Sequence, residues 1–324
     1  MMSSIKYGVS LYSFSSDYYS GRMSLEDILR KVRELGYQGI EIVAAQMVPG
    51  YPYPTDEWLA HFRFLLDQYG LAGNCWSAYI DSGIQKERDL TREEIIHFTR
   101  NDLICAKKAG FSLVRTQHAI TPDIMREMIP LCRQLNMRLA VEMHAPHHPL
   151  VPEWRDGFLP LFRGEGRGVL GVVPDCSIFQ RYPHKLFLDS AVEDGCRRDV
   201  VDLMAAMHRA GEPLENCLAL PLLPCEAEMA RDMYARFCEP AHISQIPELM
   251  DVAFYVHGKF YYLDDGQFDQ SIPYEEVLPA IAATGFNGYI ACEYEGHHYT
   301  DQLDTAEMLR RYMDMNRRIL EKCN

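Results

Sequence analysis

Three acidic residues and one histidine stand at the ends of four apolar, strand-like runs between residues 138 and 293. The runs and their polar ends are 138–144 with Glu142, 171–175 with Asp175, 252–257 with His257 and 288–293 with Glu293. If these runs are parallel strands of one closed barrel, the four side chains meet at a single rim. One imidazole nitrogen and three carboxylates suit a divalent ion, with Mn²⁺ favoured and Mg²⁺, Zn²⁺, Co²⁺ or Fe²⁺ also able to bind. We therefore predict one metal ion per chain, with Glu295 as an alternative ligand to Glu293 because both face the same side of the strand.

Two further residues near this rim could take part in proton transfer. His144 follows Glu142 by two positions, so both side chains point to the same face of the strand. A neutral imidazole can accept a proton near pH 7, which makes His144 a candidate general base; the alternative is a rim histidine hydrogen-bonded to a neighbour. Lys259 stands in the same relation to His257, and its ammonium group could bind a substrate oxygen, stabilise an enolate or simply be solvated.

Three other side chains are candidates for substrate binding. Arg115, in the strand-like run 112–117, could clamp a substrate or pair with the ligand carboxylates. Trp76 and Tyr12 could form a stacking wall for a sugar or an aromatic ring, together with Phe14 and Tyr51, although aromatic residues at a barrel mouth also serve ordinary packing.

The elements that must position these residues alternate between strand-like and helical patterns. We expect eight strands, at 6–14, 39–43, 73–80, 112–117, 138–144, 171–175, 252–257 and 288–293. Amphipathic helices are expected between them, with starts near Ser24, Thr55 and Thr91. This alternation is typical of a (β/α)₈ TIM barrel, an α/β fold whose active site lies on the loops after the strands. A doubly wound open sheet is the alternative, but it needs a glycine-rich turn after the first strand, and Ser10–Ser13 contains no glycine.

Three connections are longer than a plain barrel requires. They are 44–54 after strand 2, 145–167 after strand 5 and 178–250 after strand 6. Long loops in compact domains are usually functional lids or partner surfaces. We therefore expect a single barrel domain over residues 1–324, with an insertion at about 178–250.

Composition narrows the function classes. The net charge of −14 argues against a nucleic-acid partner, which requires a basic surface. The ten cysteines include no C-x-x-C pair, which favours buried thiols in a reducing compartment over a disulfide framework. The first residues, from Met1 to Lys6, begin no long apolar run, so we expect no signal peptide, no membrane span and a cytoplasmic location.

Several of these residues carry a family resemblance. The segments GVSLYSF (8–14) and MSLEDILRKVRELGYQGIEI (23–42), with Glu142, Asp175, His257-Gly258-Lys259 and Glu293, resemble the xylose-isomerase-like sugar isomerase/epimerase superfamily. The resemblance implies a metal, commonly manganese, that binds substrate oxygens, and a base that removes the proton beside a carbonyl. Glu-x-His at 142–144, PGYPYP at 49–54 and the long insertion look most like the metal-bearing large (alpha) subunit of bacterial C-glycoside deglycosidases. Those enzymes cleave a 3-oxo-glucoside and work with a small β-rich partner subunit.

The resemblance and the residues together give a specific hypothesis. His144 would remove the proton next to the ketone of a 3-oxo-glycoside, the metal and Lys259 would stabilise the oxyanion, and elimination would break the C-glycosidic, and possibly an O-glycosidic, bond. One alternative is a sugar isomerase or epimerase acting on a free ketose, with Glu142 and Glu293 as bases. A non-catalytic barrel subunit would not need the full ligand set. An apurinic-site endonuclease would need more metal-binding histidines and a DNA-facing surface.

Overall fold

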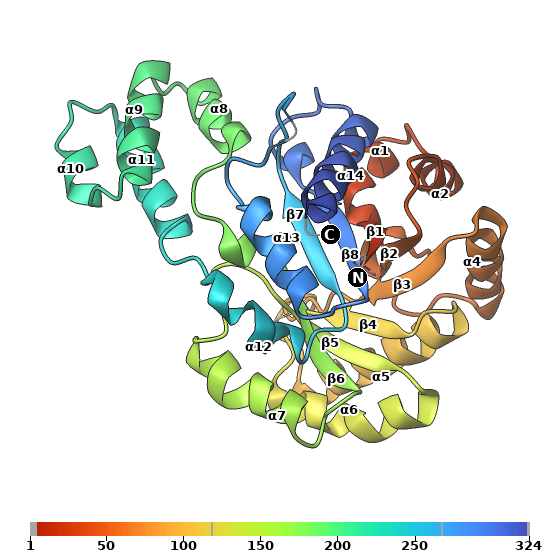
Figure 1. Cartoon of the computed structure of the whole chain (residues 1–324). Helices are drawn as coiled ribbons and strands as arrows, with labels where there is room; N and C mark the ends of the chain where they lie inside the picture. The colour runs from red at the N-terminus through yellow and green to blue at the C-terminus, as the bar shows by residue number, and fades with distance from the viewer. Residues whose placement is uncertain (1–4, 118, 267, 323–324) are drawn as a thin grey trace.

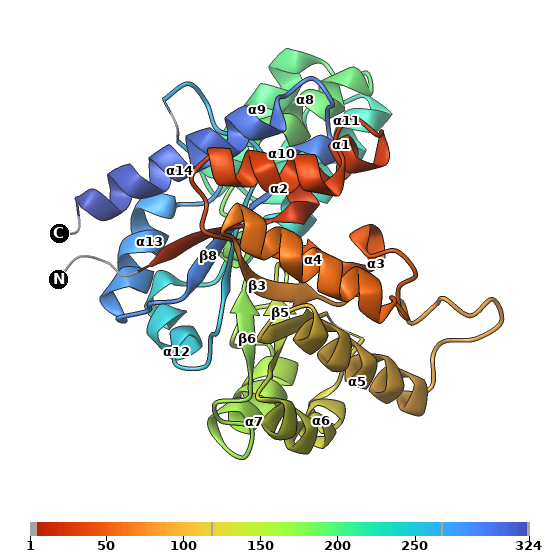
Figure 2. The ribbon, with the colours of Figure 1, turned by 90° about the vertical axis from the view of Figure 1, so that its right-hand side faces the viewer.

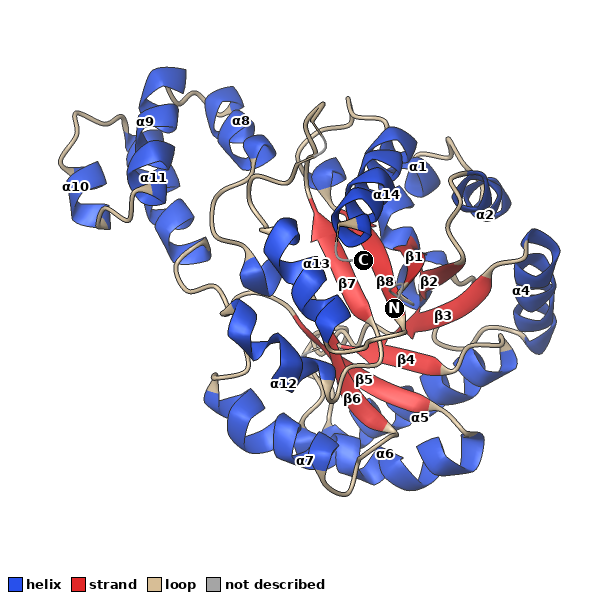
Figure 3. Cartoon of the chain, viewed as in Figure 1, coloured by secondary structure: helices blue, strands red, loops and turns tan. Residues whose placement is uncertain are grey.

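The computed structural model describes residues 5–117, 119–266 and 268–322. Residues 1–4, on which part of the expectation about a targeting signal rests, lie outside them. The eight strands are β1 (Lys6–Ser10), β2 (Gly39–Val43), β3 (Ala72–Ser77), β4 (Leu113–Thr116), β5 (Arg138–Met143), β6 (Leu170–Pro174), β7 (Val256–Phe260) and β8 (Tyr289–Tyr294). They are the central arrows of Figure 1 and the red core of Figure 3.

All neighbouring strands pair in parallel, in the order β6-β5-β4-β3-β2-β1-β8-β7. Two parallel bridges, Val172 with Ala253 and Asp175 with His257, connect β6 to the β7 side, so the sheet nearly closes on itself. The prediction of a single (β/α)₈ TIM barrel is confirmed.

Alternation along each strand divides its side chains between two layers. On β8, Ile290 and Cys292 pack in the large apolar core beneath the helices, whereas Ala291 and Glu293 face the barrel interior. A second, smaller apolar cluster fills that interior, with Cys75, Leu113, Ala140, Val173, Tyr255 and Ala291 as its buried members. The polar residues at the ends of the strands therefore lie next to an apolar layer that fills the barrel interior.

The helices that cover the barrel are α2 (Leu25–Glu34), α4 (Asp56–Tyr69), α5 (Arg92–Lys108), α6 (Pro122–Leu135), α7 (Leu159–Arg163), α12 (Ile246–Met250), α13 (Tyr274–Ala283) and α14 (Thr305–Glu321). In Figure 2, α2, α4, α5 and α6 follow one another around the outside.

Capping residues determine where several of these helices start. Ser24 and Thr91 each form a capping box with the acid three positions later, and Thr55 accepts a hydrogen bond from the Trp58 backbone. The predicted starts near these residues are confirmed.

The largest differences from the predicted strand boundaries are in the first and seventh strands, and the third strand also ends earlier than predicted, at Ser77. The first strand ends at Ser10, and Leu11–Phe14 form the 3₁₀ turn η1, where the Ser13 hydroxyl accepts a hydrogen bond from the Tyr294 backbone. The seventh strand begins at Val256 and runs to Phe260, because the residues before it pair with β6 only through the isolated bridge at Ala253. His257 thus lies inside β7, still facing inward.

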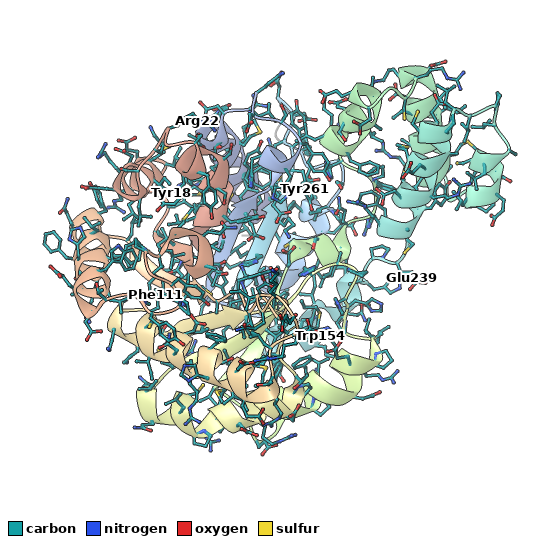
Figure 4. All side chains as sticks on the ribbon, turned by 180° about the vertical axis from the view of Figure 1, so that it is seen from behind. Tyr18, Arg22, Phe111, Trp154, Glu239 and Tyr261 are labelled. Atoms are coloured by element: carbon teal, nitrogen blue, oxygen red, sulfur yellow. The ribbon has the colours of Figure 1, made fainter. Side chains whose placement is uncertain are left out.

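The connection from β6 to β7 carries a helical arm. The arm comprises α8 (Lys185–Glu193), α9 (Arg198–Arg209), α10 (Leu214–Leu218) and α11 (Pro224–Arg236), and it projects from the barrel in Figure 1. It has its own apolar cluster, which includes Val201, Met204 and Met233. Figure 4 shows Glu239 on the segment that leads from the arm back to the barrel. The shorter helices α1 (Ser15–Tyr19) and α3 (Ala44–Met47), the 3₁₀ turns η3 (Cys176–Phe179), η4 (Ile243–Gln245) and η5 (Gly296–His298), and the π-helical turn η2 (Glu153–Phe158) complete the described structure.

Helix α14 lies unusually close to β7. A Cβ atom at Gly258 would fall 1.8 Å from the Tyr312 hydroxyl oxygen, so only glycine fits between the strand and this helix. Because Gly258 faces outward, its neighbours His257 and Lys259 face the interior.

Within the described ranges, no helix is both long and apolar enough to cross a membrane. Every cysteine described there is a free thiol.

Candidate functional site

The four predicted metal ligands come together at the carboxyl end of the barrel. Glu142 lies on β5, Asp175 directly follows β6, His257 lies on β7 and Glu293 on β8. Each side chain offers one ligand atom, and these four atoms all lie within 4.8 Å of one another. All four residues are buried. A buried group of three carboxylates and one imidazole can hold a divalent cation.

His257 is held between carboxylates on both sides of its ring. Its Nδ1 lies 2.7 Å from Glu142 Oε1, 3.4 Å from Glu293 Oε2 and 3.9 Å from Asp175 Oδ2. Its Nε2 lies 2.7 Å from Glu41 Oε2. Burial alone lowers the pKa of His257, but the surrounding carboxylates outweigh burial and hold that pKa well above its usual range.

Two ligand oxygens lack a hydrogen-bond donor among the described residues. They are Asp175 Oδ2 and Glu293 Oε2, and both are buried. The Lys259 ammonium nitrogen lies 3.1 Å from the first and 3.6 Å from the second, so it offsets part of their charge without an aligned hydrogen bond. Burial raises the pKa of Glu293 to about 8. Buried carboxylate oxygens that face one point and lack donors are costly unless a cation compensates them, so this group fits a metal ion.

Glu41 belongs to the site although the sequence did not single it out. It lies in the middle of β2, fully buried, and joins His257 to Arg115, whose Nη2 is 2.9 Å from Glu41 Oε1. Burial raises the pKa of Glu41, but His257 and Arg115 together bring it below its usual value. A carboxylate behind a metal-binding histidine orients the ring and increases its basicity. The sequence does contain one indication of this role, because Glu41 is an acid flanked on both sides by isoleucine in a buried strand.

Arg115 pairs with the carboxylates of the site. Besides Glu41, its Nη1 donates to Glu142 Oε2 at 2.9 Å, and the guanidinium is almost completely buried. Gln117, which the sequence analysis also missed, donates to the same Glu142 oxygen at 3.1 Å. Burial raises the pKa of Glu142, but Arg115 and then His257 hold that pKa well below its usual range. Arg115 therefore pairs with the site carboxylates, and because it also lines the cavity above them, its contact with a substrate stays a prediction.

A cavity of about 440 Å³ opens above these residues. It is lined by Tyr12, Val43, Ala45, Gln46, Ser77, Tyr79, Arg115, Gln117, Glu142, His144, Lys259, Glu293 and Glu295. The predicted catalytic residues and part of the predicted ligand set thus share one cavity wall. Pockets of this size hold small-molecule ligands.

His144 and Lys259 both line this cavity, and neighbouring groups hold their polar atoms in place. His144 Nδ1 lies 2.7 Å from the Ala145 carbonyl oxygen, and because a carbonyl only accepts, Nδ1 is the donor in this hydrogen bond. Lys259 Nζ lies 3.1 Å from both Asp175 Oδ2 and Glu295 Oε1. Burial lowers the pKa of Lys259, but Asp175, Glu295 and Glu293 outweigh burial and keep the lysine charged. Lys259 is only 9% exposed, so it is not a solvated surface lysine.

Trp76 does not reach the cavity, contrary to the prediction of a stacking wall. On β3 its neighbours Cys75 and Ser77 face inward, so Trp76 faces the helices, where its Nε1 donates to Asp102 Oδ1 at 2.9 Å. Tyr51 also bonds to Asp102, at 3.1 Å, and Phe14 is buried in the outer core. Of the four aromatic residues proposed for that wall, Tyr12 alone lines the cavity.

Comparison with known proteins agrees with this architecture. The model of the xylose isomerase-like TIM barrel family matches residues 29–315. The 3'-dehydrocarminate deglycosidase alpha subunit of a Microbacterium species is 31% identical over 96% of this chain and 94% of its own length. A C-glycoside deglycosidase alpha subunit of Arthrobacter globiformis is 26% identical over 94% of this chain and 87% of its own. The crystal structure of D-psicose 3-epimerase with D-tagatose from Clostridium cellulolyticum superimposes with a TM-score of 0.61 at 13% identity, over 98% of this chain and 99% of that one. The chain belongs to the xylose isomerase-like TIM barrel family.

Proposed function

We propose that this protein is a metal-dependent carbon–carbon lyase that enolises a 3-oxo-glycoside and releases its aglycone by elimination. The observation that carries the proposal is the meeting of His144 with Lys259, Glu142 and Glu293 at one cavity wall. The Ala145 carbonyl oxygen accepts a hydrogen bond from His144 Nδ1, so Nε2 is the nitrogen that we propose as the base. The names of the two deglycosidase relatives support the substrate class.

A base of this kind matches a ketone substrate. A neutral imidazole is too weak to deprotonate an ordinary sugar carbon, whereas a carbonyl group acidifies the carbon beside it. Removal of that proton by His144 Nε2 places negative charge on the ketone oxygen. Elimination then follows from the enolate and needs no attack by water.

Positive charge is available where the negative charge develops. Lys259 is held as an ammonium ion at the cavity wall, in a position to donate a hydrogen bond to the enolate oxygen. A divalent ion held by Glu142, Asp175, His257 and Glu293, for which we propose Mn²⁺, would supply Lewis-acid stabilisation of the same charge. Glu41 and Arg115 keep His257 and Glu142 in place from behind.

The word "alpha" in the relatives' names leads to a proposal about assembly. We infer that this chain works with a second, small β-rich subunit in a hetero-oligomer. The arm formed by α8–α11 is the natural candidate for contact with that subunit, because it projects from the barrel (Figure 1).

Product analysis tests the proposed reaction. The protein, loaded with Mn²⁺, is incubated with a 3-oxo-C-glucoside and with the same glucoside before oxidation, alone and with the candidate partner. Free aglycone is expected from the 3-oxo substrate only. Absence of aglycone in every combination would contradict the proposal.

A second candidate function is epimerisation of a free ketose. It is favoured by Glu142 on β5 and Glu293 on β8, two carboxylates that reach the cavity from different strands. Interconversion of free ketoses without aglycone release would select this reaction.

A further inference from the structure

A hydrogen-bonded tyrosine–histidine pair lies at the cavity and is not used by the reaction described so far. The Tyr12 hydroxyl lies 2.8 Å from His298 Nε2. Tyr12 belongs to η1, which follows β1, and His298 ends η5, which follows β8. The pair is therefore built by two neighbouring strands of the barrel and does not arise from adjacency in sequence.

This pair connects the cavity to solvent. Tyr12 lines the cavity and is half-buried, whereas His298 is exposed. The Tyr12 ring is held by edge-on contacts with the rings of His297 and His298, at centroid distances of 5.4 and 5.6 Å. The orientation of its hydroxyl group is thus fixed by packing as well as by the hydrogen bond.

The pair stands across the barrel from the proposed base. In the strand order, β1 is four strands away from β5 along the paired sheet, and four away through the β6–β7 bridges. His144 directly follows β5, so the two proton-transfer groups occupy opposite sides of the cavity. A base that takes a proton and an acid that gives one are kept apart in this way.

The proposed elimination needs an acid because of its leaving group. An aryl carbon that departs with the bonding electron pair is a very poor leaving group unless it receives a proton. We propose that Tyr12 donates this proton to the departing aglycone and that His298 replaces it from solvent. This inference rests on the proposed lyase function.

The protons and electrons of this sequence balance. His144 Nε2 takes the proton from the carbon beside the ketone, the bond between sugar and aglycone breaks, and its electron pair accepts the Tyr12 proton. As His298 Nε2 passes its proton to Tyr12, His298 Nδ1 takes a proton from solvent water, and His144 returns its own proton to solvent, so no net charge accumulates on the protein. Nothing is oxidised or reduced. The pKa of Tyr12 supports this role. Burial, and then Glu295 and Glu293, raise that pKa to about 12, so the hydroxyl group is protonated at neutral pH and has a proton to donate.

Tyr12→Phe tests the assignment with two substrates that differ in their need for an acid. One is a 3-oxo-C-glucoside, and the other is a 3-oxo-O-glucoside of nitrophenol, whose anion leaves without a proton. Loss of a general acid is expected to slow kcat on the C-glucoside by about 10²–10⁴-fold and on the nitrophenyl substrate by less than about tenfold. His298→Gln can still donate a hydrogen bond to Tyr12 but cannot relay a proton. It is also expected to lower kcat more on the C-glucoside than on the nitrophenyl substrate, but by a smaller factor than Tyr12→Phe.

The control is Tyr53→Phe, which disrupts a comparable tyrosine–histidine pair outside the cavity. Tyr53 lies 3.1 Å from His97 Nε2 and is 59% exposed. This variant is expected to treat both substrates like the wild type. Equal losses on both substrates in Tyr12→Phe would assign Tyr12 a structural role and overturn the inference, as would unchanged rates on both. If the wild type releases aglycone from neither substrate, the lyase proposal itself fails.

Discussion

The buried acid Glu226 in the arm differs from two buried acids of the barrel, Asp175 and Glu293, in how many of its oxygens accept hydrogen bonds. In the arm, Glu226 at the start of α11 is completely satisfied. Its Oε1 accepts from the Arg197 backbone N–H and Nε at 3.0 and 2.8 Å, and its Oε2 from Arg197 Nη2 and the Leu223 backbone N–H, both at 2.7 Å. In the barrel, Asp175 Oδ2 and Glu293 Oε2 lack any donor among the described residues.

This difference distinguishes an acid that stabilises the arm from two acids that we propose as metal ligands. Hydrogen bonds to Arg197 lower the pKa of Glu226 to about 2, so its charge is stable in the folded arm. Burial raises the pKa of Glu293 to about 8, so its charge is unfavourable there without a further cation. An acid that the fold leaves unsatisfied is one that a ligand can satisfy.

The largest effect is expected at the unsatisfied acid. Asp175→Ala removes a proposed metal ligand and should abolish metal retention and reduce turnover by more than about a thousandfold, while the fold survives because one of several closely spaced buried negative charges is lost. Elemental analysis after dialysis, aglycone release and circular dichroism measure these outcomes. Addition of Mn²⁺ should raise the melting temperature of the wild type and leave that of the variant unchanged. Metal content and activity equal to the wild type would show that the ligand set is wrong.

The next effect is expected beside the metal centre. His144→Ala should lower kcat by about 10²–10⁴-fold and leave metal content and melting temperature near wild type, because the imidazole is not a ligand. Steady-state kinetics with elemental analysis make the comparison. An unchanged kcat would reduce His144 to a rim histidine and favour the epimerase reaction.

Glu226, whose two oxygens both accept hydrogen bonds, should show the reverse pattern: its substitution should lower stability and leave the metal content unchanged. Glu226→Gln leaves Arg197 without its ionised partner and is expected to cost about 2 kcal/mol of stability, the usual range for hydrogen bonds to a charged group. Urea unfolding of the metal-loaded protein measures this loss, and bound metal per chain should not change. Because the pKa of Glu226 is depressed to about 2, its contribution is present at neutral pH and is lost as the pH falls from about 4.5 through 2. A drop in metal content would mean that the arm and the metal centre are coupled.

The smallest effect is expected at Asp102, a further buried acid, whose hydrogen-bond donors among the described residues are the neutral groups of Trp76 and Tyr51. Burial raises the pKa of Asp102 to about 7. The protonated side chain therefore contributes to the stability of the folded protein, and this contribution is lost as the pH rises through 7. Asp102→Asn should therefore gain stability relative to the wild type by about 1 kcal/mol between pH 6 and 9, measured by urea unfolding at each pH. A constant difference across that range would show that Asp102 does not titrate there.

Residues at strand ends could be predicted because two simple rules place them. Parallel strands converge at one rim and side chains alternate, and these rules bring Glu142, Asp175, His257 and Glu293 within reach of one ion. The same alternation places Trp76 on the outward face of β3, because Cys75 and Ser77 face inward. An aromatic ring by itself gives no information about which face of the strand it occupies.

Other parts of the site depend on contacts that no local pattern encodes. Glu41 was missed because it lies within a strand, and its role appears only when β2 and β7 face each other across the barrel. The pairing of Tyr12 with His298 depends in the same way on barrel closure. The arm was expected as an insertion at about 178–250, but its own apolar cluster was not, because that cluster is built by residues of several short helices.

The close approach of α14 to β7 ties the evolution of two distant positions together. A side chain at 258 could be accommodated only if the residue at 312 became much smaller, since even the Tyr312 ring carbon Cζ would lie 2.7 Å from a new Cβ. The strand that carries His257 and Lys259 therefore inherits a constraint from the last helix of the chain. Among natural variants, substitutions at 258 and 312 should appear together, and the C-terminal helix is a poor place for truncation or fusion, whereas the arm tolerates redesign with less risk to the metal centre.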